Sequence, residues 1–389
     1  MDIKKLDDQT LSEVIENNKL IYEEFLDLRF AIKINEEVVD FLAMNYFRAE
    51  YIGFEERPER NTPDHPIIFT SNHSGMAFPW DGIIFLSGLF KKWKYEHQAP
   101  RALTAPMLSQ TTLMNPFLIP NFWKKLGSID ASMLNFETMM QYKDYNMLIY
   151  PEGVPGIGKG FQRRYQIQRM ATSFVRMSLK YKTDVIPVYT VNGEYINPYH
   201  YTLPSIDRLI NKIGIPFLPL GWLTLFLLLQ PWLFYYAMPA KLYFVRGKRI
   251  SPYKMIKEKP YREYTQEEIE FVRNRIHEMM QKELREAEQQ YGKKPYQWKS
   301  FFKIIKNNFS KLPFLLPTGW PLLFSEFNRK YKKYGPDGFN LKLNWFNLLI
   351  LLFKNPFVLF YFIPILGWIP IMIKGYKKTK TAETKHKNS

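Results

Sequence analysis

Short apolar runs that suit buried strands alternate along this chain with longer stretches of helical periodicity. Runs of β-branched, aromatic and other apolar residues occur at 67–70, 102–105 and 147–150, and helical spacing marks 165–181 and 265–291. This alternation predicts an α/β fold, in which a layered, largely parallel sheet is flanked by helices. The ligand site of such a fold lies beyond the carboxyl ends of its strands.

The same pattern divides the chain into three parts. Residues 1–47 are predicted to form an N-terminal helical segment, a helical pair packed on the main domain, with Thr10 and Glu13 as a capping box at its start. Residues 48–292 form the main domain, which the helix at 265–291 closes. Residues 293–389 are a basic, aromatic-rich and apolar C-terminal region.

Two apolar stretches are long enough to meet a membrane. Residues 213–240 contain no charge but four prolines, which favours a re-entrant or interfacial element over a straight span. Residues 343–373 are interrupted by Lys354 and three prolines, so either a hairpin dipping into one leaflet or one kinked span would fit.

The charge balance favours anionic partners. The formal net charge is +17, and residues 293–333 carry ten Lys or Arg and one acid, interleaved with aromatic residues. Such a mixture is typical of a segment lying in an anionic membrane interface. No helix-turn-helix, zinc-finger or RNP-like pattern accompanies it, so nucleic acid is not the expected partner.

The cysteine and histidine content and the two ends of the chain limit the possible catalytic chemistry and the possible cellular location. The chain has no cysteine, which excludes disulfides, a cysteine nucleophile and cysteine-ligated zinc, and fits a reducing compartment. The six histidines lack paired helical spacing, so no metal site is predicted. The first ten residues do not resemble a signal peptide, and the lysine-rich end, 374–387, favours the cytoplasmic face of a membrane.

One histidine is placed for chemistry. His73 follows the strand at 67–70, and small residues and then Pro79 and Asp81 lead into a predicted helix. A histidine on a strand-to-helix turn with a carboxylate downstream suits a general base and its orienting partner. The alternative is a turn histidine beside a helix-capping aspartate.

A second strand end repeats this design. After the strand at 147–150 come Glu152 and Gly153, and then a glycine-rich loop with three basic residues, Lys159, Arg163 and Arg164. The loop could bind phosphate groups, or it could be an ordinary solvated basic face. His73, Glu152 and Asn192 each follow a predicted strand, so we expect them on one rim of the sheet.

Together these segments resemble the glycerolipid acyltransferase family, whose lysophosphatidic acid acyltransferase-like members share four ordered motifs. SNHSG (71–75) is similar to the NHSGG form of the first motif, and Glu152-Gly153 is similar to the third. LGSIDAS (126–132) and DVIPVYTVNGE (184–194) lie where the second and fourth motifs belong. The resemblance covers residues 48–292, the expected acyltransferase catalytic domain.

The resemblance implies transfer of a fatty acyl group from acyl-CoA or acyl-carrier protein to a hydroxyl of a glycerolipid or lysophospholipid, with no cofactor. His73 would be the general base and Asp81 its orienting partner, although seven residues separate them where the family has four. The family's phosphate-binding arginine after Glu-Gly is replaced by Val154 and Pro155. We therefore expect the three basic loop residues to serve, with Glu152 and Gly153, in substrate binding.

The acceptor stays open among a lysophospholipid, glycerol phosphate and a neutral acylglycerol. A serine hydrolase is not expected, because the chain lacks a Gly-x-Ser-x-Gly elbow. The competing hypothesis is a non-catalytic peripheral membrane protein that binds or transfers lipid.

Overall fold

The computed structural model describes residues 7–23, 26–74, 78–96, 99–106, 108, 112–203, 220–227 and 229–375. Its sheet has seven strands in the order β1-β7-β6-β2-β5-β3-β4. The strands are β1 (Glu50–Ile52), β2 (Ile68–Ser71), β3 (Pro100–Thr104), β4 (Ile129–Asp130), β5 (Asn146–Ile149), β6 (Val185–Val191) and β7 (Tyr243–Arg246). All neighbours pair in parallel except β6 and β7, which are antiparallel. The predicted α/β fold with a largely parallel sheet is therefore confirmed.

The sheet separates two hydrophobic cores. Because successive side chains of a strand point to opposite faces, Ile68 packs in one core and Phe69 in the other. Val185 and Ile186 divide in the same way. Burial on both faces explains why these strands are continuous apolar runs rather than alternating ones.

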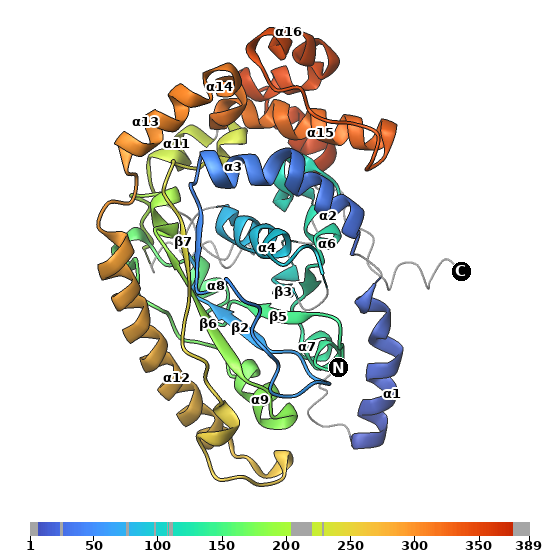
Figure 1. Cartoon of the computed structure of the whole chain (residues 1–389), viewed down its shortest axis with the longest axis vertical. Helices are drawn as coiled ribbons and strands as arrows, with labels where there is room; N and C mark the ends of the chain where they lie inside the picture. The colour runs from blue at the N-terminus through green and yellow to red at the C-terminus, as the bar shows by residue number, and fades with distance from the viewer. Residues whose placement is uncertain are drawn as a thin grey trace.

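Helices cover both faces (Figure 1). The Ile68 face packs against α7 (Met133–Met139), α9 (Ser173–Tyr181) and α12 (Gln266–Ala287). The Phe69 face packs against α2 (Leu28–Ile34), α3 (Asp40–Asn45) and α4 (Trp80–Lys92). The N-terminal α1 (Asp8–Asn18) contacts α7 through Leu11 and Ile15.

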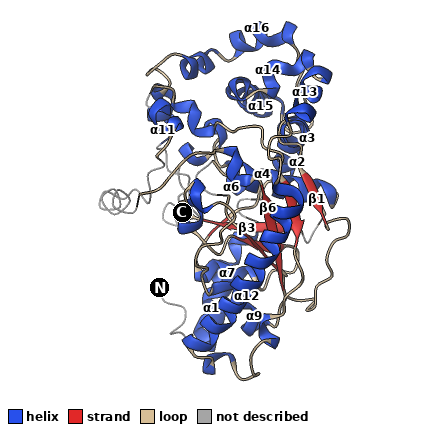
Figure 2. Cartoon of the chain, turned by 90° about the vertical axis from the view of Figure 1, so that its left-hand side faces the viewer, coloured by secondary structure: helices blue, strands red, loops and turns tan. Residues whose placement is uncertain are grey.

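The C-terminal region adds a further layer over α2, α3 and α4 (Figure 2). Its helices are α13 (Trp298–Asn307), α14 (Leu312–Leu315), α15 (Trp320–Tyr334), α16 (Trp345–Lys354) and α17 (Trp368–Pro370), with the short turns η14 (Pro356–Phe362) and η15 (Ile371–Gly375). Phe301, Phe314, Trp320 and Phe324 are buried in the same core as α4. These four aromatics therefore do not face a membrane, contrary to the interface predicted for 293–333, whereas Trp298, Phe302 and Phe309 are exposed.

In the part of the chain that the structure describes, no single helix is both long and apolar enough to cross a bilayer. The helices Trp345–Lys354 and Pro356–Phe362 are long and apolar enough only when they are taken together, and the chain bends by 101° between them. The apolar stretch predicted at 213–240 lies outside the described residues as far as residue 219. Its described part contains α11 (Trp222–Leu227) and η8 (Pro231–Tyr235), so this part is not one straight helix. The lysine-rich end, from residue 376 onward, also lies outside the described residues.

Two local predictions were wrong. The helix expected from residue 165 begins only at Ser173, because the amides of Tyr165 and Gln168 donate to side-chain carboxylates instead of forming a helical turn. The first helix is capped by Asp7, whose side chain accepts from the amide of Thr10, so Thr10 is not the cap residue.

Candidate active site

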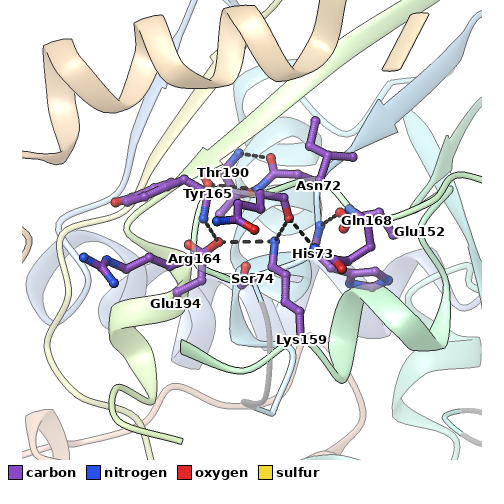
Figure 3. A network of polar contacts seen from close by, with 12 residues as sticks. Asn72, His73, Ser74, Glu152, Lys159, Arg164, Tyr165, Gln168, Thr190 and Glu194 are labelled. Carbon is purple, nitrogen blue, oxygen red and sulfur yellow. Dashed lines mark hydrogen bonds and ion pairs between the residues drawn. The ribbon is translucent and has the colours of Figure 1, made fainter. Parts of the chain in front are cut away.

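Three neighbouring strands deliver polar residues to one edge of the sheet. β2, β5 and β6 are adjacent and parallel, and they end just before His73, Glu152 and Asn192. The ends of parallel strands meet at the same edge, so residues far apart in sequence come together there. The predicted rim is confirmed (Figure 3).

Glu152 connects the loop that follows β2 with the loop that follows β5. Its Oε1 accepts a hydrogen bond from the main-chain amide of His73 (2.7 Å), and its Oε2 accepts one from the amide of Gln168 (2.6 Å). The side chain is only 3% exposed. Burial raises the pKa of Glu152, although the charge of Lys159 and these two amides act in the opposite direction. The carboxylate is therefore occupied in holding the loops, with both oxygens engaged.

The imidazole of His73 is half-buried and stacks on Tyr150, with ring centroids 4.5 Å apart. Burial, together with the charge of Lys159, lowers the pKa of His73 to about 3. The ring is therefore neutral at pH 7, as a general base must be before it accepts a proton. Among the described residues no side chain or carbonyl forms a hydrogen bond to its nitrogens.

A glycine allows the helix after Glu152 to approach this ring. α8 (Val154–Ile157) contains Gly156, where a Cβ atom would lie 2.4 Å from Cβ of Glu152 and 2.9 Å from Cδ2 of His73. Real Cβ atoms do not approach so closely, so only glycine fits without movement of the site. Sequence reasoning missed Gly156 and Tyr150. The signal available for Gly156 was the glycine-rich composition of the loop. The signal available for Tyr150 was its position at the end of the predicted strand.

Asp81 contacts the neighbour of His73. At the start of α4, its carboxylate accepts a hydrogen bond from the hydroxyl of Ser74. Burial raises the pKa of Asp81, while the Ser74 hydrogen bond opposes that shift. Within the described residues its carboxylate makes no hydrogen bond to the imidazole, so its predicted action on His73 would pass through the Ser74 turn.

The three basic residues of the loop have separate environments. Lys159 is 2% exposed, with Nζ 3.4 Å from Oε1 of Glu194 and 3.2 Å from the carbonyl of Gln166. Arg163 and Arg164 are exposed, and the guanidinium of Arg164 lies 5.0 Å from the ring centre of Phe161. Lys159 therefore holds the loop through protein partners in this structure, whereas the side chains of Arg163 and Arg164 are exposed to solvent.

Glu194 is the partner that sequence reasoning missed. It lies at the end of the segment similar to the fourth motif, and its Oε1 also accepts a hydrogen bond from the amide of Tyr165 (3.0 Å). Nearby, Tyr165 donates its hydroxyl to Asn192 (2.8 Å), and Asn72 pairs with the backbone of Thr190. These contacts fix the basic loop to the ends of β2 and β6.

Gly153 provides the sharp turn into α8. Its φ of +58° and ψ of −145° are strained for any residue with a side chain. Across the residues that the structure describes, no group of three or more His, Asp or Glu side chains could hold a metal ion.

Comparison with known proteins gives distant relatives. Uncharacterized proteins of Mycobacterium bovis and Mycobacterium tuberculosis are each 26% identical to this chain over 195 residues, and one of Mycobacterium leprae is 26% identical over 194. The matches cover 50% of this chain, and the chain spans about half the length of these curated relatives. No protein-family model matches the chain. No solved structure matches it significantly.

Proposed function

We propose that this protein is an O-acyltransferase of phospholipid or glycerolipid synthesis or remodelling. The observation that carries the proposal is the 2.7 Å hydrogen bond from the amide of His73 to Glu152, because it unites the two segments that resemble the first and third acyltransferase motifs. Among the described residues nothing forms a hydrogen bond to the nitrogens of the imidazole beside this contact, so they remain available to an acceptor hydroxyl, as the role of a base requires. The acyl donor is acyl-CoA or acyl-carrier protein.

In the proposed reaction, His73 removes the proton of the acceptor hydroxyl as its oxygen attacks the thioester carbonyl. The C–O bond forms, the C–S bond breaks, and the proton passes from His73 to the leaving thiolate, so an ester and a free thiol result. Main-chain amides of the turns after His73 or Glu152 would stabilise the oxyanion. Asp81 would keep the Ser74 turn, and with it His73, in position.

Substrate phosphates would meet the exposed Arg163 and Arg164. Either a phosphate of the donor or that of a lysophospholipid or glycerol phosphate acceptor suits these guanidinium groups. Lys159 and Glu152 would act indirectly, by holding the loop from which the arginines project. We place the enzyme at the cytoplasmic face of an anionic membrane, where acceptor lipids are available.

The test is acyl transfer by the full-length protein on lipid vesicles supplied with a panel of acyl-CoAs, acyl-carrier protein thioesters and the three acceptor classes. We expect His73→Ala to lower turnover by about 10²- to 10⁴-fold, which is the typical contribution of a general base. His65→Ala is the matched control, because His65 precedes the opposite end of β2 and contacts the carbonyl of Met140.

Retained turnover in the His73→Ala variant would refute the assignment of the base. Lipid binding without transfer from any thioester would favour the lipid-binding or lipid-transfer alternative. Product identification by mass spectrometry would distinguish ester formation from simple thioester hydrolysis.

A further inference from the structure

Exposed apolar side chains are concentrated on one part of the surface. Of the 28 large hydrophobic residues exposed in the described structure, 17 lie in two segments, 225–229 and 345–373. We call these 17 the docking face: Leu225, Phe226, Leu229, Trp345, Phe346, Leu349, Ile350, Phe353, Phe357, Leu359, Phe362, Ile363, Ile365, Leu366, Ile369, Met372 and Ile373. Exposed apolar side chains that gather on one part of a protein surface mark an interaction site.

The two segments form one surface. The amide of Ile365 donates to the carbonyl of Leu229 (2.8 Å), and the side chain of Gln230 donates to the carbonyl of Phe362 (3.1 Å). On α16 the outward residues recur at helical spacing, with Phe346 89% and Phe353 86% exposed, while Leu351 on the other side is buried. α16 is therefore anchored by one side and bare on the other.

A cavity of about 370 Å³ opens beside the docking face between α15 and the start of η14. Phe117, Tyr361 and Phe357 line its apolar part, and Arg329, Lys332 and Lys354 line its charged part. Arg329 is neutralised by Glu326, to which it donates two hydrogen bonds of 2.7 Å. Lys332 and Lys354 are exposed and have no carboxylate partner among the described residues. Two exposed ammonium groups without a carboxylate partner among the described residues therefore border this cavity.

The positive charge of the surrounding residues indicates which kind of partner binds this surface. Residues 293–354 carry twelve Lys or Arg but only two acids, Glu326 and Asp337. A bare apolar face bordered by cations is complementary to a bilayer containing anionic lipid, because the side chains enter the acyl region while the lysines meet phosphates. A second copy of this basic chain would instead bring like charges together.

We propose that the docking face binds an anionic bilayer in one leaflet, and that the cavity under Lys332 and Lys354 holds the phosphate of an anionic phospholipid. Main-chain hydrogen bonds link α11, which carries part of this face, to the site loop: the amide of Phe161 donates to the carbonyl of His200, and Tyr201 pairs with Leu220, two residues before α11. The inference extends the proposed function by naming the surface that would present lipid to His73. Its tests contain no acyl donor, so its failure is separable from failure of acyl transfer.

The first experiment measures binding of the full-length protein to vesicles of phosphatidylcholine, with and without phosphatidylglycerol, by flotation. Removing both charges in Lys332→Gln/Lys354→Gln should weaken binding to anionic vesicles about 30-fold, since each lysine near such a surface contributes about 1 kcal/mol. Binding to neutral vesicles should not change.

The matched control is Lys248→Gln/Lys257→Gln, two exposed lysines in the segment between β7 and α12. This segment lies at the end of the molecule opposite α16 (Figure 1). We expect less than about a threefold loss there, because charges farther than the Debye length of about 10 Å from the lipid are screened. Equal losses in the two double variants would overturn the headgroup site, because binding would then depend only on overall charge.

The second experiment tests the apolar contact. Phe346→Asn/Phe353→Asn should reduce binding to both kinds of vesicle at least tenfold, whereas Phe271→Asn, an exposed aromatic on α12, should leave it unchanged. Circular dichroism should show the folded state in every variant, because all of these side chains are exposed. Unchanged vesicle binding by the double phenylalanine variant would overturn the docking face.

Two further measurements distinguish a bilayer from the other possible occupants, a soluble phosphate and a second copy of the chain. If inorganic phosphate or glycerol phosphate binds in solution with the same dependence on Lys332 and Lys354 and displaces the protein from vesicles, the cavity is a site for a soluble phosphate and the lipid assignment is overturned. Sedimentation equilibrium without lipid should show a monomer. A dimer that dissociates on Phe346→Asn/Phe353→Asn would assign the face to self-association and overturn bilayer docking.

Discussion

Lys159 Nζ lies 3.4 Å from Oε1 of Glu194, and both side chains are almost fully buried. This pair holds the loop after Glu152 onto the end of β6. A basic residue that the sequence offers as a substrate ligand therefore has a protein partner in the structure.

We expect Lys159→Met to destabilise the fold by about 3–5 kcal/mol, because it leaves the buried charge of Glu194 without an opposite charge beside it. The double variant Lys159→Met/Glu194→Gln should recover most of this loss, since Gln can still accept from the amide of Tyr165. Urea unfolding measures both, and the exposed Arg163→Met is the control. Undiminished stability with a raised KM for the acyl donor would instead assign Lys159 to substrate binding.

Gly156→Ala should lower acyl transfer more than tenfold and destabilise the protein by about 1–3 kcal/mol, because the added methyl would overlap the side chains of Glu152 and His73. Gly82→Ala is the matched control. Its Cβ would meet only the hydroxyl of Tyr150, at an ordinary contact distance of 3.4 Å, and alanine suits the first turn of α4, where Gly82 lies. Equal effects of the two substitutions on turnover would argue against tight packing on His73.

Asp81 and Ser74 should behave as one unit. If Asp81 acts through the Ser74 hydroxyl, Asp81→Asn and Ser74→Ala will each lower kcat, and the double variant will lose little more than either alone. A double-mutant cycle on kcat measures this coupling. Additive effects would show that Asp81 reaches the imidazole by another route, such as direct contact in the substrate complex.

The pKa of His73 predicts a pH dependence with a defined sign. In the unfolded chain the imidazole takes up a proton near pH 6.5, but in the folded protein burial and Lys159 lower its pKa to about 3. Between these values the unfolded state binds the extra proton, so stability falls as the pH decreases from about 6.5 toward 3. The loss attributable to His73 is at most about 1.4 kcal/mol per pH unit.

The measurement is the difference in unfolding free energy between the wild type and His73→Gln as a function of pH, which removes the contributions of the other buried groups. The variant should lack this component of acid destabilisation. For the same reason kcat/KM should show no acid limb near pH 6.5. An acid limb at that pH, absent from a substrate-only control, would contradict the lowered pKa.

Much of the fold was predictable from local pattern. The strands that become β2, β5 and β6 are buried on both faces, and such strands are recognisable as continuous apolar runs. The helix at 266–287 was also predictable, because its buried residues recur at helical spacing. The placement of His73 and Glu152 on one rim followed from the parallel order of the strands.

Contacts distant in sequence were decided only by the tertiary structure. Whether Lys159 faced solvent or Glu194, and whether Asp81 met the imidazole or Ser74, depended on how loops from different strands packed. The aromatics of 293–333 are similar in the sequence, yet Trp320 is core and Phe309 is exposed. Composition and periodicity determine which residues can be buried. The residues that pair with a buried charge or pack against a buried ring come from elsewhere in the chain, so only the folded structure determines which residues these are.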